Sequence, residues 1–310
     1  MGHRDSLRAM VVVNPASAAG ATGRRWDRIA RRLSEALGPF EHVVTQEARH
    51  ATSLTRRALR DGFEMIVAVG GDGTLNEVVN GFFETGVAIA PEAVLGFVAL
   101  GTGSDFARTL GATNLEEACA RLRGRESRRI DVGHARFTDH TGVPTERLFL
   151  NVASFGCSGQ VARLVSPRLK QLNGSLAFAL ATVRALLTYR DQLITLQFDD
   201  DPSREYSITN CAFCNGRYFG AGMMVGPNAL IDDGRFDVTL WSGFGLVDFV
   251  RLHRSLYNGA HIHVRGAQSL RAIRAEATSQ QEVLLELDGE SVGRLPVQLK
   301  MLPQAIRLKI

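Results

Sequence analysis

The first hundred residues alternate short apolar runs with stretches of helical periodicity, and this alternation limits the fold more than any other feature of the sequence. The β-branched, apolar runs predict strands over residues 9–13, 42–45, 65–69 and 94–100. The stretches between them predict helices over residues 24–37, 51–60 and 75–83. Strands that are repeatedly followed by helices build a parallel sheet with helices on its faces. In such sheets ligands bind at the carboxyl ends of the strands, where the loops leave for the next helix.

The periodicity changes after Asp131. Residues 194–198, 236–240 and 295–299 alternate apolar and polar side chains, which predicts antiparallel strands with one buried face and a β-rich, sandwich-like second domain. Two helices are expected here, over residues 175–189 and 246–257, and the first is apolar nearly all round. With 310 residues the chain can bury two cores. We expect an α/β domain over residues 1–133, to which residues 302–310 return, and a β-rich domain over residues 134–301.

Charge and cysteine content narrow the class of protein. The net charge is +4 and the arginines are scattered, so no nucleic-acid partner is expected. A mild positive excess suits a protein that handles nucleotide phosphates or visits an anionic membrane, and ordinary solvated arginines explain it equally well. Four cysteines form no disulfide framework in a chain this long, which indicates a reducing cytoplasm. Cys211 and Cys214 lie in a strand-like run, residues 207–215, and are expected to be buried and inert.

A glycine-rich segment, residues 67–77 (VAVGGDGTLNE), is the strongest functional signal. Gly70, Gly71 and Gly73 allow a tight turn after the strand and bring backbone N–H groups close to a ligand. Thr74 is expected to cap the following helix, whose N-terminus favours an anion. Asp72 has no evident structural reason to stand beside phosphate, so its presence indicates a magnesium ion or a water. The segment therefore predicts a phosphate-binding loop.

Two further loops have a related composition. Residues 101–108 (GTGSDFAR) place the hydroxyls of Thr102 and Ser104 before a helix, with Asp105 near its positive end. Residues 14–25 follow the first strand, and there Asn14 and Ser17 can satisfy loop amides. Alone, each loop is explained as well by a capped turn or a flexible surface loop.

Together these segments resemble the diacylglycerol kinase catalytic-domain family, which includes the bacterial lipid kinases and the sphingosine and ceramide kinases. The resemblance covers nearly the whole chain, and the ordered set of motifs is more specific than any one of them. The matching segments are residues 14–17 (NPAS), 70–77 (GGDGTLNE), 100–108 (LGTGSDFAR), 130–133 (IDVG), 215–218 (NGRY), 227–238 (PNALIDDGRFDV) and 287–290 (LDGE).

The resemblance implies a two-domain protein with its active site in the cleft between a nucleotide-binding α/β domain and a β-rich domain. It implies nucleotide contacts from Thr45, from residues 70–76 and from Thr102, with Asp72 near the phosphates. Together with the flanking loops, the candidate ATP-binding residues are Asn14, Ser17, Thr45, Gly70, Gly71, Asp72, Gly73, Thr74, Asn76, Thr102 and Ser104.

The same resemblance implies catalytic and metal-binding roles. Glu290 corresponds to the general base that takes the proton of the lipid hydroxyl, and Asp131 to an acid that supports the site. A turn acid and a strand-end cap are the respective alternatives. Magnesium is expected on the Asp233 carboxylate and the backbone carbonyls of Leu230 and Arg235, in a structural or regulatory role. An ion-free hairpin turn is the alternative there.

Four positions depart from the family pattern. Ala99 and Ser104 stand where Pro and Asn are usual, and Ala18 and Ala19 stand where a glycine-rich run is common. A Ser side chain lacks the paired donor and acceptor of an amide, so nucleotide geometry or affinity is expected to differ.

These features predict a cytoplasmic, peripheral lipid kinase that uses ATP and Mg²⁺, with diacylglycerol as the first acceptor to test. The apolar helix over residues 176–187 is a candidate wall of an acyl pocket. An NAD kinase-like enzyme and a non-catalytic binder of lipid or nucleotide remain alternatives, and the sequence does not decide between a monomer and a homodimer. His261 and His263 have no partner constellation and are assigned no role.

Overall fold

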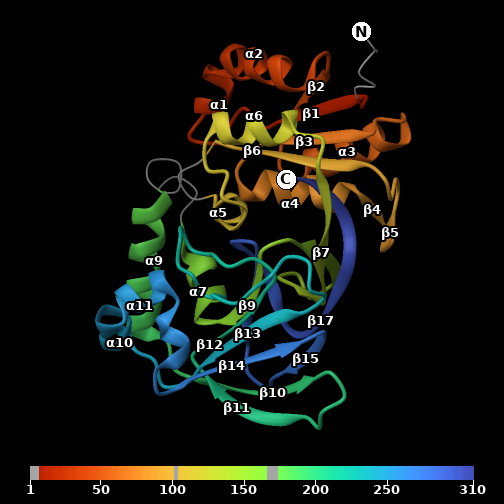
Figure 1. Cartoon of the computed structure of the whole chain (residues 1–310). Coiled ribbons are helices and arrows are strands. Elements are labelled where there is room, and N and C mark those ends of the chain that lie inside the picture. The colour runs from red at the N-terminus through yellow and green to blue at the C-terminus, as the bar shows by residue number, and fades with distance from the viewer. Residues whose placement is uncertain (1–6, 101–103, 166–173) are drawn as a thin grey trace. The chain divides into compact units, whose positions relative to one another are not determined.

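The computed structural model describes residues 7–100, 104–165 and 174–310 (Figure 1). The chain forms two compact units. The first contains the residues up to Ile130 together with Gln304–Ile310, and the second contains Asp131–Pro303. The chain passes from one unit to the other within two long strands, β7 (Ser127–Asp139) and β17 (Glu290–Lys309).

The first unit is built on a parallel sheet, as predicted. Its strands are β1 (Ala9–Val13), β2 (Glu41–Val44), β3 (Met65–Gly70) and β6 (Val94–Ala99), joined by the end of β17. The order is β17, β6, β3, β1, β2, with Arg307 of β17 opposite Val94 of β6. A short hairpin, β4 (Phe83–Glu84) and β5 (Val87–Ala88), stands apart from this sheet. The carboxyl ends of β1, β3 and β6 meet at one edge, so their loops are neighbours.

Helices cover both faces of this sheet. The helices described in this unit are α1 (Ala21–Arg24), α2 (Trp26–Leu37), α3 (His50–Arg60), α4 (Asp72–Gly81), α5 (Asp105–Leu110) and α6 (Leu115–Arg123). Helices α2 and α6 pack together on one face, and α3 and α4 on the other (Figure 1). Ile29 and Leu33 of α2 pack with the valines of β1 and β3. Because both faces are covered, every residue of β3 is buried, and its sequence is one continuous apolar run.

The second unit consists mainly of antiparallel strands. Besides β7 and β17 they are β8 (Pro144–Phe149), β9 (Val152–Gly156), β10 (Gln192–Phe198), β11 (Arg204–Ile208), β12 (Asn210–Cys214), β13 (Phe236–Trp241), β14 (Ala267–Ala272), β15 (Arg274–Thr278) and β16 (Leu284–Leu287). One series runs β14, β13, β12, β9, β16, β17, and a second runs β17, β15, β10, β11. The β-rich fold predicted from the period-two runs is confirmed.

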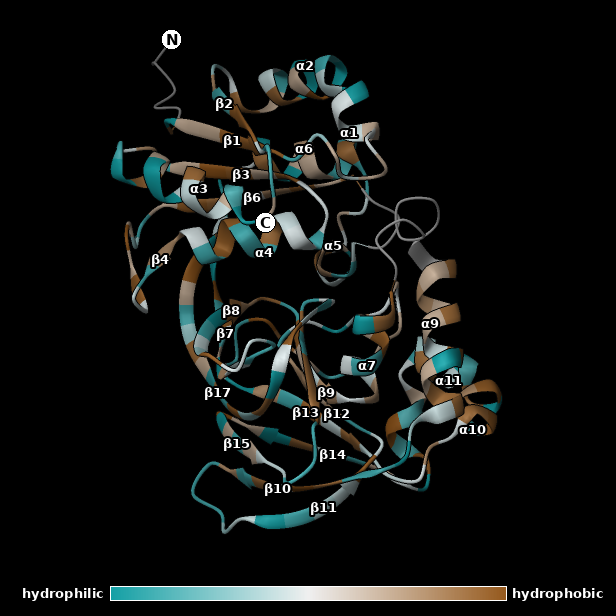
Figure 2. Cartoon of the chain, turned by 180° about the vertical axis from the view of Figure 1, so that it is seen from behind, coloured by the Kyte–Doolittle hydropathy of each residue, from teal (hydrophilic) through white to brown (hydrophobic). Residues whose placement is uncertain are grey.

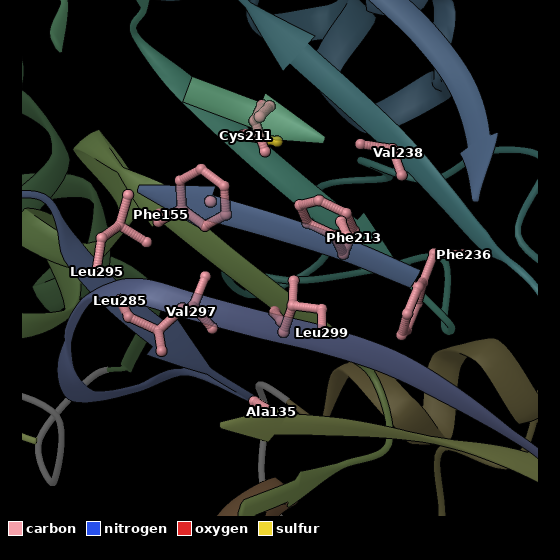
Figure 3. Close-up of a cluster of buried hydrophobic side chains, with 14 of the residues drawn as sticks. Ala135, Phe155, Cys211, Phe213, Phe236, Val238, Leu285, Leu295, Val297 and Leu299 are labelled. Carbon is pink, nitrogen blue, oxygen red and sulfur yellow. The ribbon is translucent and has the colours of Figure 1, made fainter. Parts of the chain in front are cut away.

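An apolar core fills the space between these strands (Figure 3). The rings of Phe149 and Phe236 stack with centroids 5.7 Å apart, and Phe213 meets Phe236 edge-on at 5.9 Å. Along β17, Val297 and Leu299 point into this core, while the residues between and beside them are exposed. This alternation is the period of two that the sequence displays.

Helices of the second unit lie beside its sheet: α7 (Cys157–Leu164), α9 (Gly174–Thr188), α10 (Leu246–Arg251), α11 (His253–Asn258) and a 3₁₀ turn, η1 (Ala260–His263). The helical stretch predicted over residues 246–257 is confirmed in its extent, but it divides into α10 and α11 at Leu252, where φ is −95° and ψ is 6°. The strand-like run over residues 207–215 likewise divides, between the end of β11 and β12. It breaks at Thr209, whose N–H donates to Trp241 O (2.7 Å) and whose carbonyl accepts from Cys157 N (2.9 Å).

The cysteines behave as predicted. All four are free and buried, and Cys211 and Cys214 have no exposed surface. Burial raises the pKa of both thiols, so neither carries the thiolate that reactivity requires. Among the residues that the structure describes, no helix combines the length and the apolar character needed to cross a bilayer.

Candidate active site

Asn14 joins the loops that follow β1 and β3. Its backbone N–H donates to Val69 O (3.0 Å), and its side-chain Nδ2 donates to Thr74 Oγ1 (2.9 Å). Its Oδ1 accepts from Ala16 N (3.0 Å), as the prediction that it satisfies loop amides requires. Ser17 Oγ donates to Asn14 O (2.9 Å) instead of accepting from an amide. These bonds fix both loops at the carboxyl edge of the sheet.

The loop after β1 contains three consecutive residues in the left-handed region. The φ angles are 51° at Ala18, 55° at Ala19 and 77° at Gly20. Left-handed backbone is accessible to glycine but costs an L-residue with a Cβ about 1 kcal/mol or more. This geometry explains why a glycine-rich run suits this loop, and it means that Ala18 and Ala19 hold the loop under local strain.

The glycines after β3 serve different purposes. A Cβ on Gly70 would lie 2.5 Å from Thr74 Oγ1 and 2.7 Å from Thr74 Cβ, so Gly70 is required by packing within the protein. Gly71 has extended backbone (φ −101°, ψ −173°), and a Cβ there would meet no atom of the described part of the chain within 4 Å. Neither packing nor φ requires glycine at that position. The open space beside Gly71 is therefore available to a ligand that approaches the backbone.

The expected cap of α4 is wrong. The N-cap residue is Gly71, without a side-chain cap, and Thr74 lies inside the helix, where its hydroxyl accepts from Asn14. Gly73 lies in the first turn of α4.

Asp72 has a structural role that its neighbours in the sequence do not indicate. Its Oδ2 accepts from the backbone N–H of Asp105 (2.8 Å) and its Oδ1 from that of Phe106 (3.4 Å). These amides begin α5, so the carboxylate caps this helix and links the loop after β3 to the one after β6. Ser104 is the buried N-cap residue of α5 but makes no side-chain cap bond. Thr102, predicted to contact nucleotide, lies outside the described residues.

The remaining candidates of the first unit are buried close to the loops. Thr45 directly follows β2, and its N–H donates to Val13 O (2.9 Å). Asn76 is only 1% exposed, and its Oδ1 accepts from Asn80 Nδ2 (3.2 Å). Asn76 therefore stabilises α4 from inside and presents little surface to a ligand.

Glu290 stands at the start of β17, after a tight turn, and forms an ion pair. Its Oε2 lies 2.8 Å from Arg147 Nη1, and the Arg147 side chain is mostly buried. The preceding turn has left-handed backbone at Asp288 (φ 48°) and Gly289 (φ 85°). The Asp288 carboxylate accepts from three successive backbone amides, those of residues 150, 151 and 152, at 2.9, 2.9 and 3.1 Å. The Glu286 carboxylate accepts from Gly289 N. The carboxylates of Asp288 and Glu286 thus hold the turn that positions Glu290.

Asp131 organises the segment that contains the predicted metal ligands. Its N–H donates to Ile231 O (2.7 Å), and its carboxylate accepts from Gly234 N (2.6 Å). Asn215 Nδ2 donates to the Asp131 carbonyl (3.1 Å). Asp131 is fully buried and acts here as a strand residue that shapes a turn.

The oxygen atoms of this turn suit a hard cation, but the Arg271 guanidinium already binds one of them. The Asp233 carboxylate and the backbone carbonyls of Leu230 and Arg235 are oxygen ligands of the kind that Mg²⁺ accepts. The Asp233 carboxylate already accepts from Arg235 N (3.2 Å) and from Arg271 Nη2 (2.6 Å). Arg271 is partly exposed and can move away, so a cation would replace a guanidinium that now neutralises Asp233. Among the described residues no cluster of three or more His, Cys, Asp or Glu side chains could hold a metal.

A pocket of about 110 Å³ lies within the second unit, under α9, α10 and α11. Its lining is almost entirely apolar. The inner face of α9 contributes Phe178, Thr182 and Leu186, and the other lining residues are Cys157, Ser158, Val161, Thr209, Asn210, Phe219, Met223, Val225, Trp241, Phe244, Gly245, Asp248, Phe249, Leu252 and Leu256. The apolar helix singled out in the sequence therefore forms one wall of a pocket.

Known protein families account for both units. The diacylglycerol kinase catalytic domain matches residues 8–135, and the YegS C-terminal NAD kinase beta sandwich-like domain matches residues 151–310. The chain belongs to the diacylglycerol kinase family of lipid kinases. It is therefore a phosphotransferase, and membership of a kinase family implies ATP as its phosphoryl donor and a divalent cation.

Relatives of this lipid kinase match over most of their length. A diacylglycerol kinase of Bacillus subtilis is 29% identical over 301 residues, covering 93% of this chain and 91% of that protein. A Pseudomonas putida protein named "probable lipid kinase YegS-like" is 30% identical over 269 residues, covering 86% and 84%. A crystal structure of a diacylglycerol kinase from Bacillus anthracis has a TM-score of 0.71 at 20% identity, covering 99% of this chain and 97% of that one, and it shows the shared fold.

Several residues that shape the lipid kinase site escaped the sequence interpretation. Glu77 ends the glycine-rich motif, and its carboxylate accepts from Arg49 N (2.9 Å) and Ala51 N (3.1 Å), which holds the start of α3. Arg147 gave no local signal, because its partner Glu290 is remote in the chain. Glu286 also escaped notice, although it binds Gly289 N three residues away, and its other partner, Ser154, is 132 residues away. For Glu77 the signal was its place directly after Asn76 in the motif.

Proposed function

We propose that this lipid kinase transfers the γ-phosphate of ATP to the free hydroxyl of diacylglycerol, giving phosphatidic acid, a precursor in phospholipid biosynthesis, and ADP. The observation that carries the choice of acceptor is the apolar pocket beneath α9, α10 and α11. An acyl chain matches a lining that offers few polar groups. A dinucleotide acceptor such as NAD needs hydrogen-bond partners for its sugars and phosphates, which this lining does not supply.

The phosphates of ATP bind, in this proposal, against the loops after β1, β3 and β6. Gly71 supports this placement, because glycine there leaves open space that no part of the described protein fills. The bonds from Asn14 to Val69 and Thr74 make the surrounding loops rigid, and a rigid cradle loses little entropy when phosphate binds. Thr45, Thr102 and Ser104 complete the proposed nucleotide contacts.

Glu290 acts as the general base. The acceptor oxygen attacks the γ-phosphorus, the bond from that phosphorus to the bridging oxygen breaks, and ADP leaves with the electron pair. The proton of the hydroxyl passes to the Glu290 carboxylate. Because Arg147 holds Oε2, we assign the proton to Oε1. Asp288 and Glu286 are positioning residues, since they hold the turn from which Glu290 projects.

Magnesium supplies charge neutralisation on the phosphates when it is bound. We propose that a second, structural Mg²⁺ is held by Asp233 and the carbonyls of Leu230 and Arg235, after Arg271 is displaced. The protein works in the cytoplasm, at the membrane surface that contains its acceptor.

The test is transfer of labelled γ-phosphate from ATP, with Mg²⁺, to diacylglycerol, phosphatidylglycerol, monoacylglycerol and sphingosine in mixed micelles, with NAD as a further acceptor. Glu290→Gln is expected to lower kcat by a factor on the order of 10²–10⁴ while the KM for ATP stays nearly constant. Glu282→Gln is the matched control, because Glu282 is also an exposed acid beside an arginine, Arg294.

Two other outcomes of this assay would contradict the proposed activity. Labelled NADP with no labelled lipid would establish an NAD kinase-like enzyme. ATP binding without transfer to any acceptor would establish a non-catalytic binder.

A further inference from the structure

The outer face of α9 is apolar although it faces solvent. Its exposed apolar residues are Leu176, Leu180, Val183 and Leu187, which follow one another at intervals of four, three and four, and they are 38–67% exposed. Such spacing places them in one stripe along the helix. The opposite side of α9, which carries Phe178, lines the apolar pocket. One helix thus presents an apolar surface both inward and outward.

The neighbouring helices extend this surface. Helix α10 contacts α9 and α11, and the ribbons of α9 and α10 are coloured largely as hydrophobic in Figure 2. Val247 and Val250 of α10 are 67% and 66% exposed. Large exposed apolar side chains gathered on adjacent helices mark an interaction site, because a soluble monomer rarely leaves them together in water.

Arginines border the apolar residues. Arg251 and Arg254 line an open depression together with Val250 and His253, and Arg184 is exposed on α9. Within the described part of the chain no acidic side chain pairs with Arg184, Arg251 or Arg254. Helices α9 and α11 contain no Asp or Glu at all. The surface is therefore apolar at its centre and basic at its margin.

We propose that the outer faces of α9, α10 and α11 form a docking surface that seats the protein on an anionic phospholipid membrane. Apolar side chains insert among the acyl chains while arginines meet lipid phosphates, which is the arrangement of interfacial amphipathic helices. The same three helices roof the apolar pocket, so a lipid can leave the bilayer and enter the pocket beneath them. This last step rests on the proposed function, whereas the docking itself does not.

Vesicle co-sedimentation of the full chain tests the docking surface. The vesicles contain phosphatidylcholine alone or phosphatidylcholine mixed with phosphatidylglycerol. The triple variant Leu180→Gln, Leu187→Gln, Val247→Gln is expected to bind both kinds of vesicle roughly 100-fold more weakly, given how much apolar surface these residues expose. None of the three lines the pocket. The matched control is Val87→Gln with Val143→Gln, which are equally exposed on other elements.

A second variant separates the charge contribution. Arg251→Gln with Arg254→Gln is expected to lose about fivefold in affinity per arginine on phosphatidylglycerol vesicles, and nothing on neutral ones. Added salt is expected to abolish this difference.

Two outcomes would overturn the proposal: the triple variant and the control bind vesicles equally, or the wild type is a dimer that the triple variant converts to a monomer while neither binds vesicles. Activity on a short-chain diacylglycerol that is dispersed as monomers does not require docking on a membrane, so it tests the proposed function separately from the docking surface. It is expected to stay unchanged in both surface variants. If the wild type shows no activity on that substrate, the acceptor assignment fails while the vesicle result still stands.

Discussion

Replacing Gly71 with Ala adds a methyl group beside the loop after β3 without a clash inside the protein. Among the described residues no atom lies within 4 Å of the position of the new Cβ, and φ is −101°, which alanine adopts freely. If the phosphates of ATP approach the backbone here, the methyl group occupies their space. We expect the KM for ATP to rise at least tenfold, which corresponds to about 1.4 kcal/mol of lost binding.

The effect on stability is expected to be small. Gly71 is the N-cap residue of α4, and alanine is a poorer cap by about 0.5–1 kcal/mol. The reduced freedom of the unfolded chain returns about 0.4–1 kcal/mol. The two contributions nearly cancel, so the melting temperature is expected to change by no more than about 2 °C.

Two matched variants complete the experiment. In Gly70→Ala the methyl group would lie 2.5 Å from Thr74 Oγ1, and overpacking of this kind costs about 1–3 kcal/mol, so the protein itself is expected to be destabilised. Gly245 is also an N-cap glycine with extended backbone (φ −112°, ψ −173°), so thermal unfolding of Gly245→Ala measures the cost of alanine at such a cap. Because Gly245 lines the apolar pocket, this variant is a control for stability and not for activity.

The assay combines initial rates at saturating diacylglycerol and varied ATP with thermal unfolding of each variant. An unchanged KM for ATP in a stable Gly71→Ala protein would refute the assignment of the open space to phosphate.

Three further predictions concern strain, turn geometry and charge. Ala18→Gly and Ala19→Gly are each expected to stabilise the protein by about 0.5 kcal/mol. Left-handed backbone destabilises the folded state with alanine by more than the extra freedom of glycine stabilises the unfolded state. Calorimetry measures the change in stability, and a lower melting temperature would contradict the prediction. Asp288→Ala leaves three backbone amides without their acceptor and is expected to lower the free energy of unfolding by roughly 3 kcal/mol, against about 1 kcal/mol for Asp288→Asn. Denaturant unfolding measures both losses. Equal losses would show that the turn does not depend on these bonds. Burial raises the pKa of Asp237 and Arg271 pulls it back, so Arg271→Ala raises this pKa further. An acid with a raised folded-state pKa loses stability as pH rises through that pKa, so this variant is expected to lose more stability at about pH 7 than at about pH 4, and a uniform loss would exclude the charge explanation.

The sequence by itself determined the features that depend on neighbouring residues. The runs of Val11 to Val13 and of β3 predicted strands, since a buried parallel strand is apolar throughout. The glycines at positions 70, 71 and 73 marked the segment where β3 ends and α4 begins, since glycines clustered after an apolar run are typical of a strand–helix turn. The alternation along β17 revealed the sandwich, since side chains of a strand point to opposite faces. The ordered motifs were sufficient to recognise the lipid kinase family.

Only the tertiary structure decided what individual side chains do. Asp72 was assigned to a cation from its neighbours in sequence, yet its carboxylate caps a helix that begins 33 residues later. Arg147, which pairs with Glu290, comes from a strand remote in the chain, and Asp288 is bonded to an amide 138 residues away. The pocket likewise needs α9, α10 and α11 to be folded against one sheet. Such roles depend on distances between residues that the chain brings together only when it folds, whereas strands, helices and turns follow from local geometry that the order of residues already contains.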